Sequence, residues 1–285
     1  MRLKNYYYYF VAGLADLVFD TGKSLPDMSD FREELKNNLH PRDYYLTSLL
    51  FLPNDNRNLI SFLEKKDDVW DSLGTYSHED FEEQMRIIKS ILKEKNILPD
   101  YMVGLMLEWI NSEEGIKSGE MRKKLSEGYV RKAIDSGNRF LEKWVRFDTD
   151  LNNIFTFINA KSLNLDPADY LIGDDPLTNE LLELFRSGKD FPINFEPEYV
   201  SAIFKIALEN EFLERERKTD IARWNYIDTV TCFEYFTIDL ILGYLIKYSM
   251  VLRWGKLDPE TGKEMLQKFI KETESLIISG NLIGS

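Results

Sequence analysis

The chain has 285 residues, of which 44% are apolar and 30% are charged, the balance of an ordinary globular protein. Its 49 acidic and 36 basic residues give a net charge of −13. This charge argues against nucleic acid or anionic lipid as the main partner and suits a basic protein partner. One cysteine excludes an internal disulfide, and two histidines are too few for a histidine-rich metal site.

The N-terminal apolar run is interrupted by four tyrosines at positions 6–9 and by Asp16. These interruptions argue against a signal peptide. The longest apolar run, residues 240–252, contains Lys247 and is too short to span a bilayer. We therefore expect a soluble cytoplasmic protein with no direct membrane insertion.

Helical spacing predominates along the chain. Residues 77–96 begin with Ser77 as a helix cap, followed by acidic residues and then by apolar residues at helical intervals. Two later helices are predicted to begin at Asp166-Pro167 and Asp258-Pro259, because Asp is a good cap and Pro suits the first helical turn.

Breaks are predicted near residues 98–99, 173–176 and 187–198, where Pro and Gly interrupt the helical pattern. No segment alternates convincingly enough for a sheet. The sequence therefore predicts an all-α protein.

One pattern occurs twice, 95 residues apart, in LPNDNRNLISFLEKK (52–66) and FDTDLNNIFTFINAK (147–161). The matched positions are Asp55, Asn58, Leu59, Leu63 and Lys66 in the first copy and Asp150, Asn153, Ile154, Ile158 and Lys161 in the second. On a helix these positions share one face, with the polar members either capping the helix or fixing neighbouring backbone. We interpret them as structural residues that organise the junctions between helices.

A weaker third copy aligns Ile246, Met250 and Arg253 with the apolar pair and the lysine, but it has leucines in place of the Asp and Asn. The period of 95 fits three times into 285 residues. The sequence therefore predicts three similar helical units, 1–98, 99–192 and 193–285, in a pseudo-threefold, funnel-like arrangement within one compact assembly.

Motifs for catalysis or cofactor binding are missing. TGKS (21–24) resembles the end of a phosphate-binding loop, but Leu17 stands where that motif needs glycine. Glu108 lies in an apolar stretch and is expected on the polar side of its helix. Residues 208–224 alternate acids and bases, which is typical of a solvated, ion-paired helix face, with a docking surface as the alternative. We predict no catalytic, cofactor-binding or metal-binding residue and no enzyme activity.

Residues 139–173 resemble the C-type subunits of archaeal and bacterial V-type ATP synthases, whose eukaryotic V-ATPase counterparts are the d-type subunits. The segments that carry the resemblance are Asp-Leu-x-Asn-Ile, an apolar helix that ends in Ala-Lys, and a Tyr-Leu-Ile-Gly stop; here they correspond to Asp150, Asn153, Ile154, Ala160, Lys161 and residues 170–173. Residues 243–266 are similar to the last helix pair of that family, through Tyr244, Leu245, Leu252, Arg253 and Lys256. Asn159 replaces the family's arginine, and Ser249 and Met250 stand where it has acids. NYYYYFVAGL and LFLPNDNRNL are similar to a group of uncharacterised proteins encoded among V-type ATPase genes in some bacteria, which fits a diverged bacterial member.

The resemblance implies a non-catalytic coupling subunit in the central stalk of a V-type ATPase or ATP synthase. Such a protein sits at the cytoplasmic face between the soluble rotor shaft and the membrane rotor ring, and is held there by protein partners. It needs no cofactor, and its negative charge would face basic ring loops or shaft helices.

Two other functions compete with this one. The chain could be a helical adaptor or scaffold unrelated to ATPases. An enzyme with a helical fold is the third alternative, and it predicts a deep cleft with convergent acids of raised pKa.

Overall fold

The computed structural model describes residues 5–19, 25–66, 70–90, 95–189 and 197–256. This part of the chain contains twelve α-helices, one 3-10 helix and no strand, so the prediction of an all-α fold is confirmed. The helices are α1 (Tyr8–Gly13), α2 (Met28–Asn38), α3 (Pro41–Leu49), α4 (Leu52–Leu63), α5 (His78–Lys89), α6 (Asp100–Asn111), α7 (Ser118–Asp135), α8 (Arg139–Ser162), η1 (Pro167–Asp169), α9 (Pro176–Ser187), α10 (Glu198–Ala207), α11 (Phe212–Thr231) and α12 (Ile238–Lys256).

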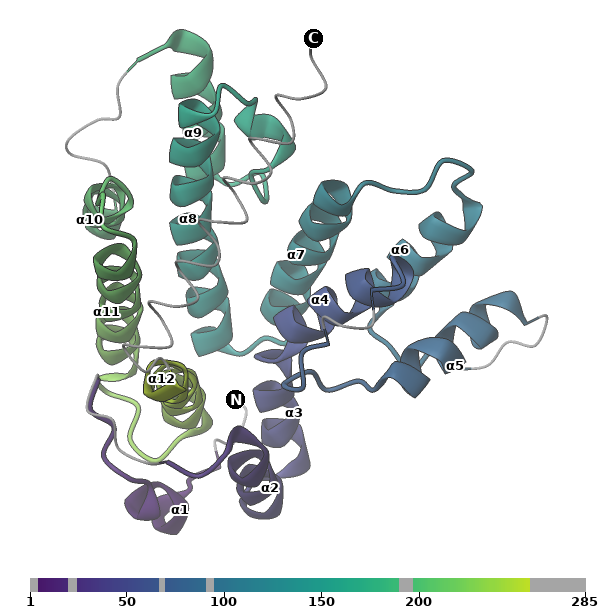
Figure 1. Ribbon diagram of the computed structural model, residues 1–285. Helices are drawn as coiled ribbons and strands as arrows, with labels where there is room; N and C mark the ends of the chain where they lie inside the picture. The colour runs from purple at the N-terminus through teal and green to yellow at the C-terminus, as the bar shows by residue number, and fades with distance from the viewer. Residues whose placement is uncertain (1–4, 20–24, 67–69, 91–94, 190–196, 257–285) are drawn as a thin grey trace, which may run out of the picture.

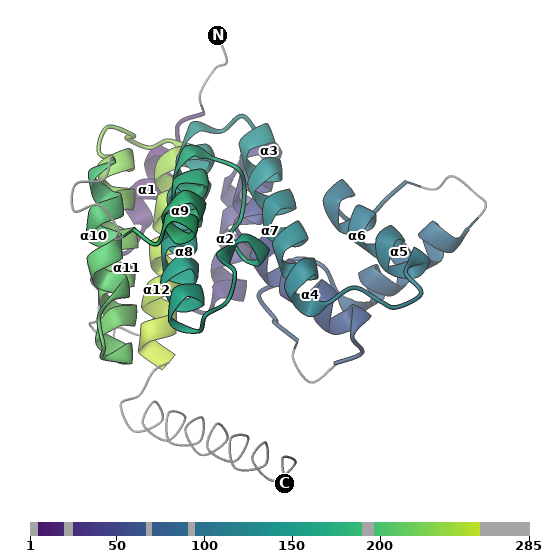
Figure 2. The same cartoon turned by 90° about the horizontal axis from the view of Figure 1, so that it is seen from above.

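The helices form two lobes joined by the turn between α7 and α8 (Figures 1 and 2). The smaller lobe holds α4–α7, and the larger lobe holds α8–α12 with α1 and α2 beside α12. Helix α3 contacts both α2 and α12 and lies between the lobes. Within the described residues, no helix is both long enough and apolar enough to cross a membrane.

The core follows the apolar stripes of the helices and continues through both lobes. Helix α8 is central: its buried face includes Leu141, Trp144, Leu151, Ile154 and Phe157, and it contacts α7, α9, α10, α11 and α12. A second cluster joins the two ends of the described chain. There, Phe31 of α2 stacks on Tyr248 of α12, with the ring centroids 4.4 Å apart.

The predicted units therefore share contacts across their boundaries. Helix α4 contacts α6 and α7 across residues 98–99, and α2 and α3 lie against the third predicted unit. The division into units 1–98, 99–192 and 193–285 and the pseudo-threefold arrangement stay predictions.

The helix ends follow local rules in most places. Ser77 begins α5 with a reciprocal capping box to Asp80, as predicted. Asp166 caps the residues after it, but only the three-residue η1 follows, so the prediction of a full helix at Asp166-Pro167 is wrong. The chain turns there because the backbone of residues 170–171 bonds back to Pro167. The helix predicted at Asp258-Pro259 lies outside the described residues.

Candidate functional site

Each of the two repeated asparagines holds a returning loop by its backbone. The Asp71 N–H donates to Asn58 Oδ1 at 2.8 Å, and Asn58 Nδ2 donates to the Asp71 carbonyl at 2.9 Å. In the second copy the Ile172 N–H donates to Asn153 Oδ1 at 2.9 Å, and Asn153 Nδ2 donates to the Ile172 carbonyl at 2.8 Å. We call this pair of hydrogen bonds the asparagine clamp. It satisfies one donor and one acceptor of a loop that has no regular secondary structure.

The two clamp helices also end in the same way. After α4, Lys65 has a positive φ of 56° and the Lys66 N–H donates to the Ser61 carbonyl at 2.8 Å. After α8, Asn164 has a positive φ of 54° and the Leu165 N–H donates to the Ala160 carbonyl at 2.9 Å. Both ends have the hydrogen bond of a Schellman motif. Helix α8 is one turn longer beyond its clamp residue than α4.

The aspartates that precede the clamps have different partners. Asp55 is fully buried, and its Oδ1 accepts the Thr75 and Tyr76 N–H groups at 2.6 and 3.0 Å. Its Oδ2 has no hydrogen-bond partner within the described part of the chain. Asp150 instead accepts the Tyr199 hydroxyl at 2.5 Å. Burial raises the pKa of both carboxyls to about 6.

All four polar residues of the pattern lie inside helices, so the alternative that they cap helix starts is wrong. They fix neighbouring backbone or side chains instead.

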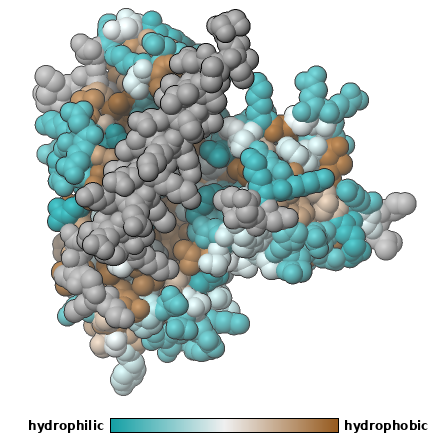
Figure 3. All heavy atoms as spheres, viewed as in Figure 1, coloured by the Kyte–Doolittle hydropathy of each residue, from teal (hydrophilic) through white to brown (hydrophobic). Residues whose placement is uncertain are grey.

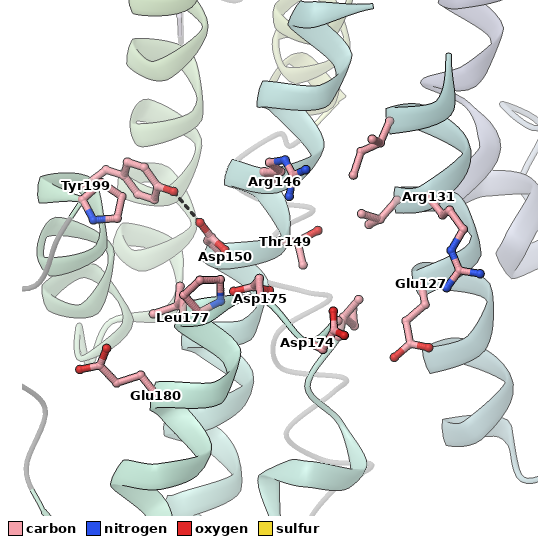
Figure 4. Close-up of a pocket in the computed structure, with 16 residues that line it drawn as sticks. Glu127, Arg131, Arg146, Thr149, Asp150, Asp174, Asp175, Leu177, Glu180 and Tyr199 are labelled. Carbon is pink, nitrogen blue, oxygen red and sulfur yellow. Dashed lines mark hydrogen bonds between the residues drawn. The ribbon is translucent and has the colours of Figure 1, made fainter. Parts of the chain in front are cut away.

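A cleft of about 710 Å³ surrounds Asp150, between α7, α8, the loop before α9, and the start of α10. Figure 4 shows Arg131 and Glu127 on α7 across the cleft from Arg146, Thr149 and Asp150 on α8. Burial and the Asp150 carboxyl both raise the pKa of Tyr199, so the phenol stays protonated and acts as the donor. Acids outnumber bases in the lining, which suits a cationic or hydrogen-bonding ligand.

The second carboxyl near Asp150 already has a structural role. Asp175 caps α9 by accepting the Thr178 N–H at 3.0 Å and the Thr178 hydroxyl at 2.8 Å. Asp175 is therefore engaged at the start of α9 and does not form a convergent pair with Asp150. Among the described residues, no group of three or more His, Cys, Asp or Glu side chains could hold a metal ion.

A second hollow, a groove of about 840 Å³, lies between the two lobes. The smaller lobe contributes the start of α4, residues 72–73 and α7, and the larger lobe contributes α2, α8, α11 and α12. We call it the central groove. Its wall on α8, α11 and α12 is charged, because Asp148, Asp220, Arg223 and Arg253 all line it.

Asp220 is the centre of this charged wall and is only 1% exposed. It accepts Trp254 Nε1 at 2.8 Å, Arg223 Nη1 at 3.3 Å, and the guanidinium of Arg253. Arg223 also donates to Asp148 Oδ1 at 2.8 Å, which ties α11 to α8. Although burial acts to lower the pKa of Arg223, the two aspartates raise it, so the guanidinium stays charged.

Comparison with known proteins adds one finding. Residues 4–277 match the family described as Protein of unknown function (DUF2764). The chain belongs to this family. No curated protein and no solved structure matches the chain.

In this DUF2764 chain, the structure separates the predicted site residues. Asp150 and Asn153 lie at or beside the cleft, Asp55 and Asn58 in the smaller lobe, and Arg253 on the central groove. Lys66 and Lys161 are exposed, and Lys66 lies beyond the end of α4.

Two predictions for charged residues had different outcomes. Glu108 is exposed and bonds to Lys124 at 2.5 Å, in agreement with the predicted polar face. The prediction of a solvated face over 208–224 is wrong at Asp220, because α12 covers that carboxylate. The sequence reasoning also missed Tyr199 and Arg223, since their partners are 49 and 75 residues away.

Proposed function

We propose that this protein is a non-catalytic coupling protein of the central stalk of a V-type ATPase or ATP synthase. In this role it links the soluble rotor shaft to the membrane rotor ring at the cytoplasmic face, through protein partners. The proposal rests on the resemblance of residues 139–173 to the C-type subunits of those enzymes. The observation that carries it is the asparagine clamp, which occurs on α4 and α8 at positions 95 residues apart.

The central groove is the surface we assign to the shaft. A torque-transmitting contact needs a concave, rigid seat with polar groups that fix orientation. The groove provides a hollow between two lobes, and the Asp148–Arg223–Asp220–Arg253 network makes one wall rigid. Binding here needs no bond cleavage and no cofactor.

The decisive experiment is a mild-detergent affinity purification of the tagged protein from its own host, followed by mass spectrometry. Catalytic, shaft and ring subunits near stoichiometry support the proposal. If those subunits are missing while the intact complex is present in the same lysate, the protein is better described as a helical adaptor.

A groove variant makes the experiment specific. Ser249 lines the groove, so Ser249→Trp fills it, whereas Leu163→Trp adds the same ring at a site that is 67% exposed on the end of α8. We expect Ser249→Trp to lower recovery of the shaft proteins roughly tenfold or more and Leu163→Trp to leave it unchanged. Equal recovery with both variants would refute the assignment of the groove.

A further inference from the structure

Five aromatic side chains are exposed together beside α1 and the connection between α11 and α12. Tyr6, Tyr8 and Tyr9 are 55, 56 and 97% exposed, and Phe233 and Tyr235 are 84 and 65% exposed. We call these five residues the aromatic patch. Figure 3 shows hydrophobic and weakly polar residues reaching the surface at the lower left, where Figure 1 places these two segments. Side chains of this size and kind, gathered at one place on the surface, mark an interaction site.

The two segments of the aromatic patch are bound to each other. The Tyr7 N–H donates to the Phe236 carbonyl at 2.7 Å. The Tyr8 ring lies between those of Tyr6 and Phe236, with centroid distances of 5.7 and 4.8 Å. Because residues 6 and 236 are far apart in sequence, the patch exists only in the folded chain.

The framework beneath the patch is also fixed. The Tyr7 hydroxyl donates to Asp43 Oδ2 of α3 at 2.5 Å, and Asn5 Nδ2 donates to the same oxygen at 2.9 Å. Phe236 holds a left-handed φ of 57°, which a non-glycine residue adopts only where its surroundings impose it. A patch held in this way loses little conformational entropy when a partner binds.

The charged residues near the aromatic patch favour a basic partner. Residues 5–19 and 228–246, which build it, contain no Lys or Arg, and they include Asp16 and, between Phe233 and Tyr235, Glu234. Two further acids of these segments are already engaged, because Asp228 is ion-paired with Lys247 and the buried Asp239 accepts from Asn138. Aromatic faces attract cations. A second copy of this chain is disfavoured because each copy carries a net charge of −13, and the same charge disfavours anionic lipid.

We propose that the aromatic patch docks a Lys- and Arg-rich helix or loop of a protein partner, with its cationic side chains over the exposed rings. This inference goes beyond the proposed function, because it holds for a basic partner in any assembly. None of the five patch residues lines the central groove, so the two surfaces can be tested separately.

The test measures binding of a fluorescent helical peptide with a Leu face and a Lys face, by fluorescence anisotropy on the full chain. The matched peptide has Glu in place of Lys. We expect the Lys peptide to bind and the Glu peptide not to bind. The triple variant Tyr8→Ser, Tyr9→Ser, Phe233→Ser should weaken binding roughly tenfold or more.

A matched control removes apolar surface elsewhere. Phe212 and Leu213, at the start of α11, are 56 and 55% exposed, so Phe212→Ser with Leu213→Ser should change affinity less than about twofold. Tyr9→Phe should retain affinity while Tyr9→Leu lowers it, because only Phe keeps the ring face. Thermal melts establish that each variant is folded.

Cys232 offers a second readout, because it is the chain's one cysteine, is exposed, and precedes Phe233. A benzophenone attached there should cross-link to the Lys peptide and not to the Glu peptide.

Three outcomes would overturn the proposal. The first is peptide binding that the triple variant does not change. The same holds if phosphatidylcholine vesicles, with or without phosphatidylglycerol, bind through the patch in place of the peptide. Dimerisation that the triple variant abolishes, measured by sedimentation, would assign the patch to a second copy instead.

Discussion

Asn153→Ala tests the clamp on α8. Asn153 is 1% exposed, and the substitution removes both of its hydrogen bonds to the Ile172 backbone. The Thr178 hydroxyl lies 3.3 Å from the Ile172 carbonyl and can donate to it by releasing Asp175 Oδ2. The Ile172 N–H is then the main group left unpaired. An unsatisfied N–H of this kind costs about 1–3 kcal/mol. We therefore expect the free energy of unfolding to fall by ~2 kcal/mol.

The assay is thermal denaturation followed by circular dichroism. A loss of ~2 kcal/mol corresponds to a fall in Tm of about 4–8 °C for a chain of this size class. Asn152→Ala is the matched control, since Asn152 is the exposed neighbour and, among the described residues, its side chain bonds within α8, to Asp148. Asn58→Ala should give a similar fall, and the two losses should add because the clamps hold separate loops. If Asn153→Ala and Asn152→Ala melt within about 1 °C of each other, the clamp does not stabilise the fold and the reasoning fails.

Four further predictions concern two buried aspartates and two glycines. Because the pKa of Asp55 is about 6 in the folded chain and 3.8 ordinarily, its contribution to stability is present below pH ~4 and is lost as the pH rises through 6. Asp55→Asn should remove that loss of about 3 kcal/mol, and a urea titration that still shows the same pH dependence in the variant would contradict it. Gly74→Ala should destabilise by about 1–3 kcal/mol, since its Cβ would meet the Asn58 amide at 2.6 Å. In contrast, Gly104→Ala, in open space on α6, should stabilise by up to about 1 kcal/mol in the same melts. Asp220→Ala should cost roughly 2 kcal/mol, because Trp254 Nε1 loses its buried acceptor and Arg223 keeps only Asp148 as an ion-pair partner among the described residues. A cost under about 1 kcal/mol would refute the network.

Local rules made part of the clamp predictable. Asn58 and Asn153 were found because they precede paired apolar residues at a fixed spacing, and the expectation that they organise helix junctions required only the helical period. The backbone group that each asparagine binds could not be predicted from the helical period. Asn58 binds the backbone of Asp71, 13 residues later, and Asn153 binds the backbone of Ile172, 19 residues later. The two separations differ because the chain between the asparagine and its partner differs in length.

The two aspartates of the pattern illustrate the same limit. They occupy matched positions in sequence, yet Asp55 binds backbone amides and Asp150 binds the hydroxyl of Tyr199 on α10. Which group comes within reach depends on the helix that packs opposite, and that packing is set by the whole core rather than by the helix itself.

Residue spacing and composition were enough to predict the helical class, the repeated helix with its asparagine, and the acidic balance of the chain. The helical period can be recognised within a few turns of a helix, and the acidic balance is a sum over all residues, so neither depends on how distant segments pack. Three other features came from the packing of distant segments: Asp220 is buried beneath α12, residues 6–9 lie beside Phe236, and two lobes enclose a groove. These features depend on contacts between distant segments, and packing fixes such contacts through shape and volume that no local pattern records.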